Sequence, residues 1–231
     1  MLYDKDIREP LFEYFDETLG KVRIVEEKKI GSARADVMLV TDSCLIGVEI
    51  KSDADTYARL DKQVKEYNRC FDKNYVVVGS KHANHVEEHV PEWWGIITVE
   101  ENNAKPDFYL LREPKLNPRN HYEFFRKRQL AFLWRPELFH ILVRFGFPKY
   151  AYKSKKFVQD YIYEHIEEGA LKAEITYELF ERDYSKTIEE IEEYKKAGYL
   201  YVDLYGITAD FSDTNPYKRL NDFKLKFKPT T

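Results

Sequence analysis

The start of the chain alternates short apolar runs with polar breaks. Residues 4–19 carry apolar side chains at helical spacing and end before Gly20, a residue type that commonly follows the last turn of a helix. Three strand candidates follow, at residues 22–27, 35–41 and 44–51. The polar pair Asp42-Ser43 suits a tight hairpin between the last two. The pattern predicts a helix and then an antiparallel meander.

The next stretch returns to helical and then strand patterns. Residues 57–71 place Leu60, Val64, Tyr67 and Phe71 on one helical stripe. Residues 75–79 are almost wholly apolar, which is typical of a parallel strand covered on both faces. The remaining candidates are a short helix at 84–89 and strands at 95–99 and 108–111. The order predicts an α/β fold with a core of α-β-β-β-α-β type and a mixed sheet.

The strand signals fade after residue 116, where Pro114 and Pro118 mark a boundary. We therefore expect two domains, an α/β domain at residues 1–116 and a mainly helical domain at residues 117–231. Helix candidates in the second domain are residues 123–133, 136–145, 154–167, 170–180 and 187–197. Residues 222–231 read equally as an edge strand or a loose tail.

Composition excludes two classes of protein. Hydrophobic residues make up 43% and aromatic residues 16% of the 231 residues, so the chain has enough apolar surface to fold. It has no run of eighteen apolar residues and no apolar stretch at its start. We expect a soluble cytoplasmic protein that does not bind membranes, with Cys44 and Cys70 as reduced, buried thiols.

Charge is unevenly distributed along the chain. The formal net charge is -4, which does not favour binding to a polyanion, yet residues 112–156 are strongly basic. Their basic residues are Arg112, Lys115, Arg119, Arg126, Lys127, Arg128, Arg135, Arg144, Lys149, Lys153, Lys155 and Lys156, against Glu113, Glu123 and Glu137. This segment either holds phosphates or is a solvated face, and the sequence leaves both interpretations open.

The residues with the strongest chemical signal lie in the predicted hairpin. Side chains two apart in a strand share a face, so Glu49 and Lys51 point together while Val48 and Ile50 face the core. Counting outward from the turn places Asp36 of the preceding strand opposite Glu49.

Two neighbouring carboxylates repel, and a divalent cation that binds both removes this cost. Mg²⁺ suits such oxygen ligands, with Mn²⁺ as the other candidate. The ion would stabilise charge on a phosphodiester while Lys51 orients the attacking water or stabilises the transition state. The alternative is an ordinary Glu-Lys pair on an exposed strand face.

The helix, the meander and the set Asp36, Glu49, Lys51 resemble the PD-(D/E)XK nuclease superfamily, whose fold is restriction-endonuclease-like. The resemblance implies that Asp36 and Glu49 bind the metal ion together with the backbone carbonyl of Ile50, and that Lys51 is catalytic. The first motif reads Ala35-Asp36 and lacks the proline.

The helix at 57–71 adds a second similarity. Gln63 and Tyr67 are spaced like the Gln-x-x-x-Tyr motif of RecB-type members, which implies that they support the metal site or contact DNA. An ordinary amphipathic helix with Tyr67 in its apolar stripe is the other interpretation. The upstream histidine of RecB-type nucleases is missing.

A narrower resemblance joins the chain to small bacterial and phage proteins described as nuclease-like. It rests on the segments at residues 49–56, 91–95 and 133–135 and spans about residues 4–135. Many superfamily members add a further acid from the first helix or first strand. Among Glu9, Glu13, Glu26 and Glu27, we favour Glu27 or Glu13 as that metal ligand.

Two other groups are set aside. His82, His85 and His89 lack a further ligand at metal spacing, so a solvated helix face is the better interpretation. The Trp93-Trp94 pair could stack on bases, but core packing is favoured.

The sequence therefore predicts a Mg²⁺-dependent nuclease that hydrolyses phosphodiester bonds, with DNA as the expected substrate. The alternative is a catalytically silent nuclease fold that binds nucleic acid or a protein partner, for example as a phage counter-defence factor. A subunit of a larger complex or a homo-oligomer is a third interpretation.

Overall fold

The structure is a computed structural model, and it describes residues 2–103, 105–121, 125–186 and 189–190. The chain divides into two compact units, Met1–Arg128 and Gln129–Thr231. The division falls later than the junction expected near residue 116, inside the helix α3 (Phe125–Leu130).

A six-stranded mixed sheet forms the first unit, in the spatial order β1-β2-β3-β4-β5-β6. The strands are β1 (Arg23–Ile30), β2 (Ala33–Val40), β3 (Leu45–Lys51), β4 (Lys73–Gly79), β5 (Gly95–Asn102) and β6 (Lys105–Arg112). The first three strands are antiparallel, β4 runs parallel to β3 and β5, and β6 is antiparallel to β5. The predicted meander, the buried parallel strand and the mixed sheet are confirmed.

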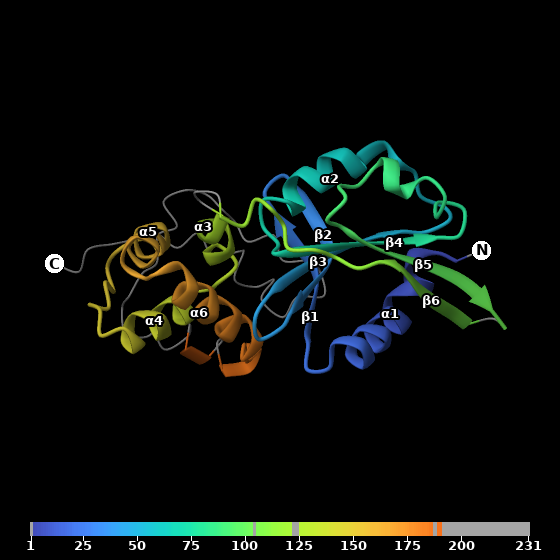
Figure 1. The fold of residues 1–231 in the computed structure, drawn as a ribbon. Coiled ribbons are helices and arrows are strands. Elements are labelled where there is room, and N and C mark those ends of the chain that lie inside the picture. The colour runs from blue at the N-terminus through green and yellow to red at the C-terminus, as the bar shows by residue number, and fades with distance from the viewer. Residues whose placement is uncertain (1, 104, 122–124, 187–188, 191–231) are drawn as a thin grey trace. The chain divides into compact units, whose positions relative to one another are not determined.

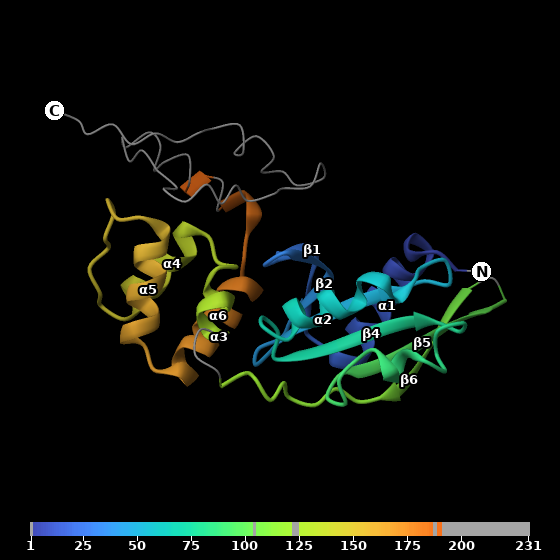
Figure 2. The same ribbon diagram turned by 90° about the horizontal axis from the view of Figure 1, so that it is seen from above.

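The sheet has one helix on each face, α1 (Asp4–Leu19) on one side and α2 (Leu60–Tyr67) on the other (Figure 1). Ile7, Leu11 and Phe15 of α1 pack with alternate residues of the strands in one apolar cluster. Figure 2 looks onto the α2 side, with β4, β5 and β6 following one another across the sheet. The α-β-β-β-α-β order of an α/β core is thus present.

Several predicted bounds are wrong. The helix expected at residues 57–71 is a 3-10 turn, Tyr57–Arg59, followed by α2, which ends at Tyr67. Phe71 is nevertheless buried, because the turn after α2 directs it back to the sheet. The helix expected at 84–89 is only the 3-10 turn Val86–Glu88.

Strand β1 continues to Ile30, beyond the acids that were expected to end it. β1 is an edge strand whose second half is mostly polar, so the alternation of apolar and polar side chains that predicts a strand is weak there.

The second unit is helical, as expected. Its helices are α4 (Arg135–Arg144), α5 (Lys155–His165) and α6 (Glu168–Phe180). Their bounds differ from the predictions by one or two residues: α4 begins and ends one residue earlier, α5 is shorter at both ends, and α6 begins two residues earlier. Helix α3 ends at Leu130, three residues before the predicted end. The helix expected at 187–197 falls mostly, and the segment 222–231 entirely, outside the described residues. None of the described helices is long and apolar enough to cross a membrane.

Candidate functional site

The hairpin of β2 and β3 has the predicted register. Val37 lies opposite Val48, and Thr41 N donates to Cys44 O at 3.0 Å at the turn. Continuing this register places Asp36 opposite Glu49. Val48 belongs to the apolar cluster under α1, so the alternate residues Asp36 and Glu49 point to the α2 side of the sheet.

Helix α2 lies close to β3 because residue 47 is glycine. A Cβ atom at Gly47 would lie 2.3 Å from the ring of Phe71 and 2.6 Å from the ring of Tyr67, distances that real Cβ atoms do not show. The absent side chain therefore lets the fully buried ring of Tyr67 rest against the strand. This approach brings the Tyr67 hydroxyl to the hairpin.

The Tyr67 hydroxyl joins the two strands. It accepts from Asp36 N at 3.1 Å, and Glu49 Oε2 lies 2.8 Å away as an acceptor for its proton. Val48 O is a second acceptor at 3.0 Å. Burial, followed by the charges of Glu49 and Asp36, raises the pKa of Tyr67 well above its ordinary value, so the hydroxyl keeps its proton.

Glu49 is the centre of a buried polar network. Its side chain has no exposed surface, and Lys51 Nζ donates to its Oε1 at 2.6 Å. Gln63 Nε2 donates to the same oxygen, while Gln63 Oε1 accepts from Lys51 Nζ at 3.1 Å. The structure thus brings Glu49, Lys51, Gln63 and Tyr67 together.

Asp36 is held beside this network through the backbone. Its Oδ2 accepts from Ile50 N at 2.8 Å, so the residue between Glu49 and Lys51 orients the carboxylate. The Ile50 side chain faces the opposite, apolar side of the sheet. Asp36 keeps 23% of its side chain exposed, which leaves one side of the carboxylate open to a ligand.

Both carboxyl groups have an increased affinity for a proton. Burial, followed by the negative charge of Glu49, raises the pKa of Asp36 from 3.8 to about 7. The Ile50 N–H and the cations of Lys51 and Arg8 oppose this shift. Burial also raises the pKa of Glu49, against the effects of Lys51, Tyr67 and Gln63. The site therefore favours added positive charge.

Arg8 of α1 is a site neighbour that the sequence analysis missed. Its guanidinium donates to Asp36 O at 3.3 Å and lies 3.9 Å from Asp36 Oδ1. It also contacts Glu26 Oε2 at 3.4 Å and Glu27 Oε1 at 2.8 Å. The pairing of Arg8 with Asp4 at i and i+4 was the only local signal, and it does not distinguish a site from a surface pair.

The two candidates for a further acidic ligand lie elsewhere. Both oxygens of Glu27 are engaged by arginines, Oε1 by Arg8 and Oε2 by Arg34 at 3.0 Å. Glu13 is exposed, two residues along α1 from the buried Leu11 and so on the opposite side of the helix. Within the described ranges, no three His, Cys, Asp or Glu side chains are arranged to hold a metal ion.

His82, His89 and Trp94, which the sequence analysis set aside, contact other side chains of the first unit. His82 and His89 contact the ring of Tyr57, with ring centroids 4.8 and 4.1 Å apart, so the expected solvated helix face is wrong for them. Trp94 is fully buried and its Nε1 donates to Asn68 Oδ1 at 2.8 Å, which confirms core packing for this residue, whereas Trp93 is only half-buried.

Both cysteines are free thiols. Cys70 is buried as expected, but Cys44 is only half-buried. Its position at the hairpin turn keeps it at the margin of the sheet.

Comparison with solved structures finds SfsA of Pyrococcus furiosus in complex with Ca²⁺, at 18% identity and a TM-score of 0.32. This match covers 48% of the present chain and 64% of SfsA. A score this low does not define the fold.

Protein cII of Enterobacteria phage P4 is similar in sequence. It is 28% identical over 151 residues, which cover 63% of this chain and 55% of protein cII. The chain thus spans about half the length of the curated relative that it matches. The profile of the family described as bacteriophage P4 protein cII matches residues 3–197. Because that match includes the whole sheet and the described helices, the chain belongs to the bacteriophage P4 protein cII family.

Proposed function

We propose that this protein is a metal-dependent nuclease of the PD-(D/E)XK type that hydrolyses phosphodiester bonds in DNA. The observation that carries the proposal is the convergence of Asp36, Glu49 and Lys51 on one face of a hairpin. Gln63 and Tyr67 of the adjoining helix contact the same carboxylate. An ordinary exposed Glu-Lys pair does not account for this, since Glu49 is fully buried.

The donor set fits Mg²⁺ or Mn²⁺. Mg²⁺ is commonly bound by one or two carboxylates together with water and substrate phosphates, without a closed cage of protein ligands. Asp36 and Glu49 supply the two carboxylates, and the raised pKa of Asp36 is consistent with Lys51 and Arg8 compensating the pair only in part. The carbonyl of Ile50 is the third ligand that we propose. When bound, the ion would polarise a phosphate oxygen and lower the pKa of a water molecule.

The remaining side chains have distinct roles in this proposal. Lys51 would place its ammonium against the charge that develops on the phosphate, and Gln63 holds that ammonium through the contact at 3.1 Å. Tyr67 orients Glu49 by its hydrogen bond to Oε2. Asp36 is oriented by Ile50 N–H, so both carboxylates are preorganised before a substrate arrives.

The first test is DNA cutting by the purified chain with plasmid and single-stranded DNA, in Mg²⁺, in Mn²⁺ and in EDTA. We expect cutting that needs the metal and falls about 100-fold or more in Glu49→Gln and in Lys51→Ala, because each removes charge at the reacting phosphate. Lys65→Ala is the matched control for the second variant, because Lys65 is an exposed residue of α2. Cutting at the wild-type rate by both site variants would reject the assignment.

A second candidate is a binding protein that keeps the fold without catalysis. It is favoured by the arrangement of acids, since the described part of the chain presents a pair of carboxylates without a third. Calorimetric titration with Mn²⁺ separates the two. A metal affinity that Asp36→Asn abolishes supports the nuclease, whereas no affinity in the wild type supports the silent fold.

A further inference from the structure

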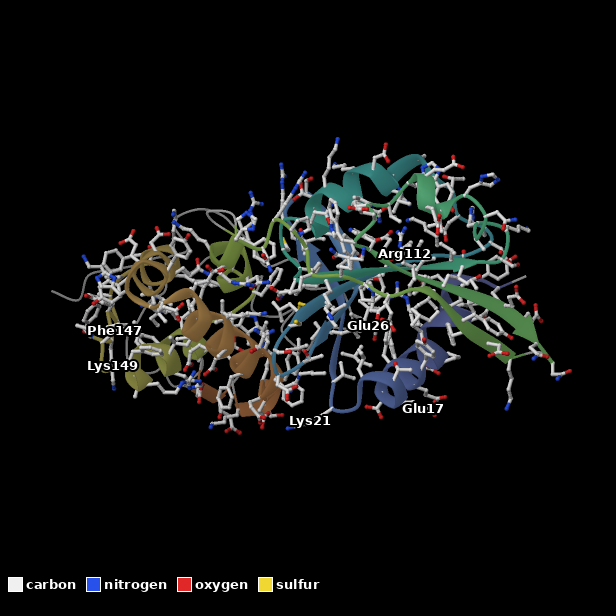
Figure 3. The ribbon with its side chains drawn as sticks, in the orientation of Figure 1. Glu17, Lys21, Glu26, Arg112, Phe147 and Lys149 are labelled. Atoms are coloured by element: carbon white, nitrogen blue, oxygen red, sulfur yellow. The ribbon has the colours of Figure 1, made fainter. Side chains whose placement is uncertain are left out.

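The loop between α4 and α5 has an unusual composition for an exposed connection. Residues 145–154 include four aromatic side chains, two lysines and no acid. Phe145 is 37% exposed and Tyr152 is 73% exposed, although large aromatic side chains are usually mostly buried. Phe147 and Lys149 lie close together on this loop in Figure 3. The loop therefore presents apolar rings and positive charge together.

The rings form a continuous path. Phe145 stacks on Phe147 with centroids 5.9 Å apart, and Phe147 meets Tyr161 of α5 at 5.4 Å. Tyr161 contacts Tyr150 at 4.8 Å, and Tyr150 contacts Phe157 at 5.2 Å. Phe157 is itself 39% exposed. We call these five residues the aromatic platform.

The loop is held in a fixed and strained conformation. Tyr150 has a φ of 48°, a left-handed value that is unfavourable for a bulky side chain. The guanidinium of Arg135, a buried residue, donates to Tyr150 O at 2.6 Å and to Ser154 O at 3.3 Å. The fold thus holds the rings in place before any ligand binds, which lowers the entropic cost of binding.

Three arginines of the basic segment at residues 112–156 have structural roles. Arg126 pairs with the buried Asp72, Arg135 holds the loop, and Arg144 pairs with Glu174 and Glu178.

Lys149 and Lys153 are exposed on the loop, and Lys153 Nζ lies 5.3 Å from the ring centroid of Phe157. At the start of α5, Lys155 Nζ donates to Ala131 O at 3.4 Å and Lys156 pairs with Asp160 at 2.8 Å. The positive charge that borders the platform is therefore carried mainly by Lys149 and Lys153.

We infer that the aromatic platform and its bordering lysines bind single-stranded DNA. Exposed rings stack on unpaired bases without regard to sequence, and lysines along the same path neutralise phosphates. Paired bases do not offer their faces to such rings, so duplex DNA fits less well. The inference rests on the proposed function only in taking DNA as the ligand.

The test is fluorescence anisotropy of the full chain with a labelled oligothymidylate of about 16 nucleotides, the upper site size of a comparable stacking groove. EDTA is present throughout, so that binding is measured without cutting. Phe157→Ala removes a platform ring, and Lys149→Ala removes a bordering charge. Tyr177→Ala and Lys21→Ala are the matched controls, because Tyr177 is an exposed ring on α6 and Lys21 an exposed lysine of the first unit.

We expect Phe157→Ala to weaken binding about tenfold, the loss of one stacked base. Lys149→Ala should lower the slope of log affinity against log salt by about 0.7, as for one phosphate contact in a single strand. Tyr177→Ala and Lys21→Ala should bind as the wild type does. DNA cutting is assayed separately in Mg²⁺, so that failure of the platform and failure of the nuclease site give different results.

Tighter binding of the duplex than of the single strand would overturn the inference, as would binding only to an RNA oligonucleotide of matching sequence. Equal losses in Phe157→Ala and Tyr177→Ala would do the same, because the effect would not belong to the platform. Normal binding together with absent cutting would leave the inference intact and reject the proposed nuclease.

Discussion

At the scale of single residues, the fold raises the pKa of Asp36 far enough to change its protonation near neutral pH. Its carboxylate is largely buried, faces the charge of Glu49 and has a pKa of about 7. A group with this pKa changes its charge near neutral pH, so both stability and metal affinity depend on pH there.

The first consequence concerns stability in metal-free buffer. The unfolded Asp36 loses its proton near 3.8, whereas the folded one keeps it until about 7. The folded state therefore binds more protons in this window, and the free energy of unfolding falls as pH rises from about 4 to about 7. We expect Asp36→Asn to remove about 4 kcal/mol of this fall, since each pKa unit corresponds to about 1.4 kcal/mol, as measured by urea unfolding in EDTA.

Asp16→Asn is the control, because Asp16 is an exposed carboxyl of α1. Its pH profile should follow that of the wild type. Parallel profiles for Asp36→Asn and the wild type would show that Asp36 titrates at its ordinary pH.

The sequence predicted the central residues but not their surroundings. Asp36, Glu49 and Lys51 could be found because strand alternation and hairpin counting are local rules. Arg8 could not, because its contact with Asp36 spans twenty-eight residues and depends on where α1 crosses the sheet. Glu27 was favoured as a ligand, yet Arg8 and Arg34 engage its carboxylate, and no periodic pattern reveals such pairing.

At the scale of elements, the packing of α2 on β3 positions the site. The close approach depends on Gly47, whose missing Cβ leaves room for the rings of Tyr67 and Phe71. Gln63 and Tyr67 then reach Glu49 from the same helix.

We expect Gly47→Ala to lower the free energy of unfolding by about 1–3 kcal/mol, the usual cost of overpacking. It should also lower the DNA-cutting rate of the folded protein, because the Tyr67 hydroxyl is displaced from Glu49. Val48→Ala is the matched control, since it weakens the core under α1 and leaves the α2 side unchanged. If the two variants lose stability equally and cut equally, the close approach does not position the site.

Element types were more predictable than element ends. All six strands and both sheet-covering helices follow from apolar periodicity, but the helix at 57–71 was predicted too long at both ends. Its apolar stripe continues to Phe71 although the helix does not, because a turn can keep a side chain on the same surface. Periodicity reports burial, and burial alone does not fix backbone conformation.

At the scale of the whole molecule, the chain forms two units with separate tryptophan probes. Trp93 and Trp94 lie in the first unit and Trp134 in the second, and the sequence has no other tryptophan. Each unit has its own buried apolar residues, so we expect two unfolding transitions.

The proposed metal site lies in the first unit, so a metal should stabilise that unit alone. In a Trp134→Phe protein, Mg²⁺ at one hundred times its dissociation constant should add about 2.7 kcal/mol to the fluorescence-detected transition. Adding Asp36→Asn should abolish the gain. The second transition, followed by circular dichroism, should stay in place, and an equal shift of both would contradict a site confined to the first unit.

The hydroxyl of Tyr67 has one proton and two acceptors within reach, Glu49 Oε2 and Val48 O. When Glu49 turns toward a cation or takes up a proton, the phenol can donate to the backbone carbonyl with little change of position. The phenol therefore keeps a hydrogen bond when the carboxylate exchanges partners deep inside the fold. This contact adds no penalty for a buried unsatisfied donor, so ligand exchange at Glu49 need not loosen the packing of Tyr67.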